Sequence, residues 1–178
     1  MRIIAGSHKG TRIFAPKGME TRPTGDRVRE AAFNLLGPGA TEEATVLDLF
    51  AGSGAMGLEA LSRGAVSAVF VESDLDAVRA IERNLDKLRL TGATIVRQGV
   101  STALAQEANA DRKYDLVLVD PPYVMTDYDM LSRYLPLVLA EDGLVVLESD
   151  ERNEPELPFV VRTSRTYGGT RVTVFAHG

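Results

Sequence analysis

The chain has 178 residues, of which 44 % are hydrophobic and 25 % are charged, as in an ordinary soluble domain. It contains no cysteine, which excludes disulfides, thiolate metal sites and a cysteine nucleophile, and its two histidines lie near opposite ends. No apolar run approaches the ~20 residues of a membrane span, and no secretory signal is visible. We expect a cytoplasmic protein without a metal ion or membrane contact, and we expect it to be a monomer.

Charge is distributed unevenly along the chain, whose net charge is −5. Residues 1–30 carry seven Lys or Arg against three acids, whereas the remainder carries thirteen bases against twenty-two acids. This asymmetry is typical of an acidic body with a basic arm that meets a polyanion, and a solvated, flexible terminus is the alternative. We expect a small hairpin or extended arm over 1–22 and one domain over 23–178. The candidate contacts to the polyanion are Arg2, Lys9, Arg12, Lys17, Arg22 and Arg27.

From residue 24 onward, helical and strand patterns alternate. Apolar residues recur at helical spacing from Val28 to Leu36, and Gly37-Pro38-Gly39 ends that helix. Near-continuous apolar strands follow at 45–50, 67–72, 93–98, 115–120 and 143–149. Helices are expected at 55–64, 74–90, 100–109 and 127–139. The alternation predicts an α/β fold with a mostly parallel, Rossmann-like sheet covered on both faces, and the tail around Gly168-Gly169 predicts an antiparallel hairpin.

A glycine-rich turn follows the first of these strands. Gly52, Gly54 and Gly57 form the pattern Gly-x-Gly-x-x-Gly directly after the strand and at the start of a helix. Glu72 ends the next strand, twenty residues after Gly52. This is the spacing of a nucleoside-binding crossover, in which the acid accepts a hydrogen bond from a ribose hydroxyl. The glycine pattern alone would be weak evidence, but the strands, the helix and the acid together make it specific.

Asp48 decides which nucleoside fits best. It lies in the same strand just ahead of the glycine loop, which contains no Lys or Arg. A carboxylate about 4 Å from a phosphate would cost ~4 kcal/mol at an effective dielectric constant of about 20, which argues against NAD or FAD. S-adenosylmethionine has an ammonium and a sulfonium and no phosphate, so its electrostatic interaction with Asp48 would be attractive. The alternative for Asp48 is a carboxylate that caps the helix or the turn.

The fourth strand ends in Asp120-Pro121-Pro122-Tyr123. Ligands of open α/β sheets bind beyond the carboxyl ends of the strands, where Asp48 and Asp120 are expected to converge. The prolines lack N–H groups and stiffen the loop, so Asp120 and the carbonyl of Pro121 can accept hydrogen bonds from an exocyclic amine. Tyr123 offers a face on which a flipped base can stack. A strand terminator followed by a surface tyrosine is the plain alternative.

The segments LDLFAGSGAMGLEALSRGA, FVESD and VDPPY resemble the motifs of class I adenosylmethionine-dependent methyltransferases. The Asp-Pro-Pro-Tyr form resembles amino-group methylases of nucleic-acid bases. RIIAGSHKGTRI and TRPTGDRVREAAFNLL look like the start of the bacterial 16S ribosomal RNA guanine-N2 methyltransferases. The resemblance covers almost the whole chain, and the N-terminal block together with Asp-Pro-Pro-Tyr is its specific part.

The resemblance implies a role for each motif. The methionine end of the cofactor would meet Asp48, Phe50, Gly52 and Gly54; the ribose would meet Glu72 and Ser73; the adenine would meet Gly99 and Val100. Asp120, Pro121 and Tyr123 would hold the target base, with Asp120 also touching the cofactor. The sequence departs from the expected pattern at Gly99, where an Asp or Asn would meet the adenine amine.

The expected activity is therefore methyl transfer from S-adenosylmethionine to a guanine N2 in 16S ribosomal RNA, either naked or in an assembling small subunit. An adenine-N6 methylase acting on DNA or RNA is the first alternative, because the same tetrapeptide accepts any exocyclic amine. The others are a dehydrogenase-like nucleotide-binding module and a catalytically silent RNA-binding protein.

Overall fold

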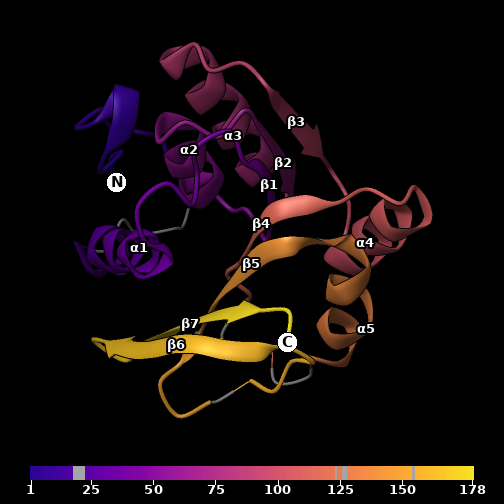
Figure 1. Ribbon diagram of the computed structural model, residues 1–178. Helices are drawn as coiled ribbons and strands as arrows, with labels where there is room; N and C mark the ends of the chain where they lie inside the picture. Colours follow the sequence, from indigo (N-terminus) through magenta and orange to yellow (C-terminus); the bar gives the residue numbers. More distant parts are fainter. Residues whose placement is uncertain (18–22, 123, 126–127, 154) are drawn as a thin grey trace.

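A seven-stranded sheet organises the computed structural model, in the order β3-β2-β1-β4-β5-β7-β6 (Figure 1). The model describes residues 1–17, 23–122, 124–125, 128–153 and 155–178. The parallel strands are β1 (Thr45–Leu49), β2 (Ser67–Val71), β3 (Ala93–Val96), β4 (Tyr114–Val119) and β5 (Leu139–Asp150). The antiparallel edge consists of β6 (Val160–Tyr167) and β7 (Thr170–Ala176). The predicted mixed sheet with a C-terminal hairpin is confirmed.

Helices cover both faces of the sheet, as the apolar character of the parallel strands predicted. The elements are η1 (Gly6–His8), α1 (Pro23–Leu36), α2 (Ala55–Ser62), α3 (Leu75–Leu88), α4 (Val100–Asn109) and α5 (Asp129–Val138). One buried cluster joins the sheet to α1, α2 and α3, and a second cluster joins it to α4 and α5. Figure 1 shows these two helical layers on opposite sides of the strands.

Strand β5 starts at Leu139, four residues before the predicted start at 143. Tyr114 pairs with Leu139, and the register shifts between Tyr114 and Leu116. The residues Ala140, Glu141 and Asp142 carry no apolar run, so hydrophobicity gave no signal for this part of the strand. Backbone pairing with β4 holds it in the sheet instead.

The N-terminal segment, which we define as residues 1–17, pairs with itself and lies against the body. Arg2 and Arg12 form an antiparallel bridge, and the amide of Ile3 donates to the carbonyl of Thr11 at 2.9 Å. Ile3 and Ile13 are buried in the same cluster as α1, α2 and β1. The segment is therefore packed into the domain, and the boundary that the sequence predicted at 22/23 falls beside residues outside the described ranges.

Glu59 of α2 holds this segment in place. Its side chain is fully buried, and its carboxylate accepts the amides of Ile4 at 2.8 Å and Ala5 at 2.9 Å. Arg63 donates to the same carboxylate at 2.7 Å, and Arg29 of α1 lies 3.6 Å from it. A buried carboxylate is stable only with such partners, so Glu59 couples the N-terminal segment to α1 and α2.

Candidate active site

Four carboxylates lie at the carboxyl ends of four adjacent parallel strands, in the order Glu72 (β2), Asp48 (β1), Asp120 (β4) and Glu148 (β5). In these strands, Phe70, Val46, Leu118 and Val146 belong to the cluster under α1, α2 and α3. Because side chains alternate along a strand, residues two positions further face the same side. All four carboxylates therefore face the α1–α2–α3 side of the sheet. Asp48 lies one pleat deeper, because it pairs with Phe70 and Leu118.

The glycine loop makes the sharp turn from β1 into α2. Phe50, Gly52 and Gly54 have φ values of 57°, 55° and 79°, and the amide of Gly54 donates to the carbonyl of Ala51 at 2.7 Å. Positive φ is uncommon for a residue with a side chain, and at Phe50 it marks a backbone held by its surroundings. Gly57 has a different reason: a Cβ there would lie 2.4 Å from Cε1 of Phe70. The glycines therefore permit the turn and the close packing of α2 on β2.

Asp48 caps α2 from below. Its Oδ2 accepts the amide of Gly57 at 2.9 Å, and its side chain is buried. Burial raises its pKa well above the ordinary value, the bond from Gly57 lowers it, and the negative charges of Asp120 and Glu72 raise it again. The interpretation of Asp48 as a capping carboxylate is thus confirmed for this oxygen. The capping bond also fixes the orientation of the carboxylate at the floor of the site.

Glu72 is fixed by two backbone amides. Its Oε2 accepts from Gly52 at 2.8 Å, and its Oε1 accepts from Asp74 at 2.8 Å. The sequence spacing placed Glu72 opposite the glycine loop but did not show that its carboxylate accepts a hydrogen bond from the loop. An ionised carboxylate can accept about four hydrogen bonds. Glu72 can therefore hold the loop and still accept from hydroxyl groups of a ligand.

These groups surround a cavity of about 720 Å³, large enough for a nucleoside cofactor. Seven predicted site residues line it: Asp48, Phe50, Gly52, Glu72, Ser73, Asp120 and Pro121. Gly54 does not line it but begins α2 beneath the loop, against Ile81. Gly99 and Val100 are also absent from the lining: Gly99 caps α4, and Val100 is buried in the opposite cluster. Their predicted contact with adenine stays a prediction, and Tyr123 lies outside the described residues.

Asp120 reaches the open cavity directly after β4. Its side chain is exposed to solvent within the cavity, and partial desolvation by the surrounding walls raises its pKa to about 6. A carboxylate with such a pKa is ionised at neutral pH and can still take up a proton. Prolines 121 and 122 follow it on the same wall.

Arg29 of α1 and Glu148 of β5 are among the cavity residues that the sequence did not predict. Burial and the charge of Asp120 raise the pKa of Glu148 well above its ordinary value, while Arg29 lowers it. Glu148 belongs to no motif, so only its place at the end of an apolar strand could have drawn attention to it. Arg29 was counted as a base of the N-terminal region, but its burial depends on packing that the sequence does not show.

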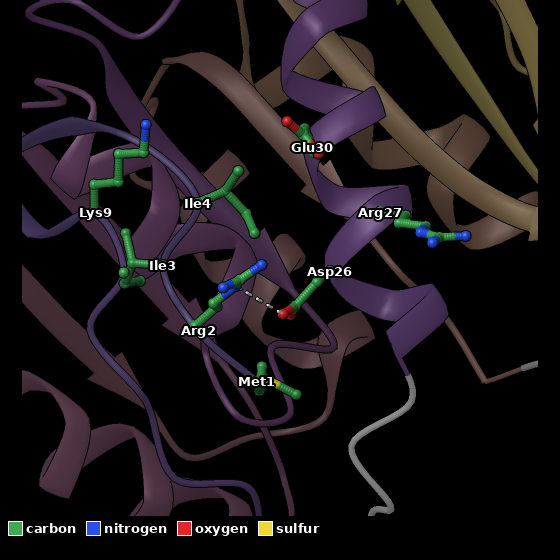
Figure 2. Close-up of a pocket in the computed structure, with 9 residues that line it drawn as sticks. Met1, Arg2, Ile3, Ile4, Lys9, Asp26, Arg27 and Glu30 are labelled. Atoms are coloured by element: carbon green, nitrogen blue, oxygen red, sulfur yellow. Dashed lines mark ion pairs between the residues drawn. The ribbon is translucent and has the colours of Figure 1, made fainter.

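The predicted polyanion contacts surround the N-terminal segment without forming one cluster. Arg2, Lys9 and Arg27 line a second cavity of about 640 Å³, shown in Figure 2. There Arg2 lies 3.8 Å from Asp26, and Lys9 and Arg27 point in different directions (Figure 2). Arg12 is exposed, and Lys17 lines the carboxylate cavity. Arg22 lies outside the described residues.

A family model described as Conserved hypothetical protein 95 matches residues 1–176. The chain belongs to this family. This chain is 39 % identical over 186 residues to YlbH of Bacillus subtilis, provisionally named an rRNA methyltransferase, and the match covers 98 % of both chains. It is 37 % identical over 158 residues to ribosomal RNA small subunit methyltransferase D of Escherichia coli K12, covering 86 % of this chain and 76 % of the relative.

Solved structures agree with this assignment. This chain matches yhhF of Escherichia coli, provisionally described as a methyltransferase, with a TM-score of 0.87 and 34 % sequence identity. The match covers 99 % of this chain and 97 % of yhhF. The chain is thus a methyltransferase with the class I fold, as the sequence motifs predicted. In the described part of the chain, no helix has the length and apolarity to cross a bilayer. Within the same residues, no group of three potential ligands could hold a metal ion.

Proposed function

We propose that this protein transfers a methyl group from S-adenosylmethionine to the exocyclic N2 amine of a guanine in 16S ribosomal RNA. The observation that carries the proposal is the cavity's charge beside Asp120-Pro121: five carboxylates and two bases line it. Such a cavity favours a cationic ligand and disfavours a phosphate. The ribosomal RNA small subunit methyltransferase D relatives support the choice of substrate.

The cofactor fits the end of the cavity formed by the glycine loop. There Asp48 would attract the ammonium group, and Glu72 would accept from the ribose hydroxyls while it holds Gly52 and Asp74. When bound, S-adenosylmethionine supplies an electrophilic methyl group on a sulfonium. Phe50 and Met56 line the same cavity and exclude water around that group.

Asp120 and the carbonyl of Pro121 would orient the target amine. An aromatic amine is a weak nucleophile because its lone pair is delocalised into the ring. Hydrogen bonds accepted from its two protons turn the lone pair toward the methyl group, which is a positioning effect. Asp120 then takes the proton that the methylated amine loses, and its pKa of about 6 suits this transfer near neutral pH.

The basic residues of the N-terminal segment would bind the RNA backbone. Lys9 and Arg12 of this segment and Arg27 of the neighbouring α1 are exposed, and the acidic remainder of the chain would repel a polyanion without them. Phosphate contacts would set the register of the RNA, while the cavity selects the base. The predicted cytoplasmic location and monomeric state belong to this proposal as expectations.

The test is incubation with labelled S-adenosylmethionine and either 16S ribosomal RNA or small subunits that lack the modification, followed by nucleoside analysis. We expect label in N2-methylguanosine. Label in N6-methyladenosine would transfer the assignment to an adenine methylase and leave the cofactor proposal intact. Absence of label from both RNA and subunits would contradict the proposed activity.

A further inference from the structure

Glu148 lies at the end of the carboxylate row that is farthest from Glu72. Val119 of β4 pairs with Leu147 of β5, so Asp120 and Glu148 are the next residues along two neighbouring parallel strands. Such strands run roughly 4.8 Å apart. The cofactor end of the cavity is on the other side of Asp120, at β1 and β2. A base whose amine meets Asp120 therefore extends its remaining edge toward Glu148.

Glu148 is half-buried and lines the cavity, and its carboxylate has no hydrogen-bond partner among the residues that the structure describes. The exposed Asp120 likewise accepts no hydrogen bond from the described residues, whereas Asp48 and Glu72 accept backbone amides of α2, the glycine loop and the turn after β2. A carboxylate that accepts no hydrogen bond from the fold keeps its acceptor positions open, and both of these carboxylates line the cavity. They are therefore available to hydrogen-bond donors of a ligand.

We propose that Glu148 selects guanine by accepting the N1–H of the target base while Asp120 and Pro121 hold its N2 amine. The inference rests on the proposed guanine-N2 activity and names the residue that discriminates the base. Guanine presents N1–H beside its exocyclic amine, whereas adenine presents a lone pair at N1 beside its own amine. A carboxylate accepts from the first and repels the second. Asp120 and Pro121 do not make this distinction, because both purines offer them an amine.

Arg29 favours the ionised form of Glu148 that this selection requires. It lines the same cavity, and its charge lowers the pKa of Glu148 against the effects of burial and Asp120. Its own place is fixed, because Nη2 donates to the carbonyl of Arg2 and to Asp26. A cationic cofactor would act in the same direction. A protonated Glu148 would instead donate to the N1 of adenine, so the ionised state is part of the selection.

Glu148→Gln tests the inference, because its amide nitrogen can donate to a purine N1 that has no hydrogen. The substrate is an RNA fragment around the nucleotide mapped with the wild-type enzyme, synthesised with either guanosine or 2-aminopurine riboside at the target. Both bases carry the 2-amine, and only guanine carries N1–H. We expect the wild-type enzyme to prefer guanine in kcat/KM by about ten- to hundred-fold, the range of a specific base contact. In Glu148→Gln this ratio should fall at least about ten-fold.

Glu141→Gln is the matched control, because Glu141 is an exposed residue at the other end of β5. It should keep the wild-type ratio. Affinity for S-adenosylmethionine should stay within about three-fold in both variants, and a larger loss in Glu148→Gln would place Glu148 at the cofactor and overturn the inference. If Glu148→Gln does not fold, Glu148→Asp carries the test: guanine turnover and the ratio should both fall, and an unchanged ratio contradicts the inference.

The two proposals fail in different ways. If the wild-type enzyme forms N2-methylguanosine and Glu148→Gln keeps the wild-type preference for guanine, the base-selecting role is wrong and the proposed activity stands. If the wild-type enzyme methylates an adenine instead, both the proposed activity and the role of Glu148 are overturned.

Discussion

The two halves of the carboxylate cavity are built differently. The proposed cofactor half, formed by Asp48, Glu72 and the glycine loop, is held by backbone amides at 2.8–2.9 Å. The proposed base half, formed by Asp120, Pro121 and Glu148, has carboxylates without such bonds among the described residues. The fold therefore preorganises one half, whereas the acceptors of the other half would be used by a substrate under the proposed function.

Removal of the Asp120 carboxylate should have the largest effect on turnover. In Asp120→Ala the amine loses an acceptor that orients it, and we expect turnover to fall by about 10²–10³-fold or more. Affinity for S-adenosylmethionine should stay within a few-fold, because the cofactor half is intact. Single-turnover methylation and calorimetry measure the two quantities. Wild-type turnover in this variant would refute the role of Asp120.

The reciprocal change is Glu72→Ala in the cofactor half. It removes the acceptors of the Gly52 and Asp74 amides and the proposed ribose contact. A hydrogen bond to a charged group contributes roughly 1.5–3 kcal/mol, so cofactor affinity should weaken about ten-fold or more. Calorimetry measures it, with Glu82→Ala on the exposed face of α3 as the control. Unchanged affinity would remove Glu72 from the cofactor site.

Substitution of a carboxylate in each half should change the free energy of unfolding in opposite directions. The pKa of Asp120 is raised to about 6 in the folded protein, so its favourable contribution is present below the unfolded pKa near 4 and is lost as pH rises to about 6. At pH 8, Asp120→Asn should therefore stabilise the ligand-free protein by about 1 kcal/mol after solvent screening, or ~2–4 °C in Tm.

Glu72→Gln should instead destabilise the protein by about 1–3 kcal/mol, because one of its two accepted amides would face an amide nitrogen. Thermal unfolding at pH 5 and pH 8 measures both variants. A destabilising effect of Asp120→Asn at pH 8, or an effect that did not shrink toward pH 5, would show that the ionised Asp120 carboxylate does not destabilise the folded protein.

The N-terminal segment gives the smallest expected effect on catalysis by single substitutions. Lys9→Ala should weaken RNA binding by a few-fold and make it less dependent on salt, because each neutralised phosphate releases counterions. Cofactor affinity should not change. A salt titration of RNA binding measures this, and an unchanged slope would show that Lys9 does not touch the RNA.

The sequence predicted the elements and the cofactor half because both depend on local patterns. Apolar runs defined the strands, and the spacing from Gly52 to Glu72 defined the crossover. Glu148 could not be predicted in the same way, because its position depends on which strands pair and on which face each residue points. The same limit applies to residues 1–17, because the burial of Ile3 and Ile13 depends on distant elements. We expect deletion of this segment to destabilise the domain.

Proton release on cofactor binding tests most directly whether the cavity attracts a cation. S-adenosylmethionine should lower the pKa values of the cavity carboxylates, which burial has raised. Calorimetry at pH 6 in buffers of different ionisation enthalpy should show net proton release, with up to about half a proton from Asp120, because a group at its pKa is half protonated. S-adenosylhomocysteine, which lacks the sulfonium charge, should release fewer protons. Equal or no proton release with the two ligands would contradict the account.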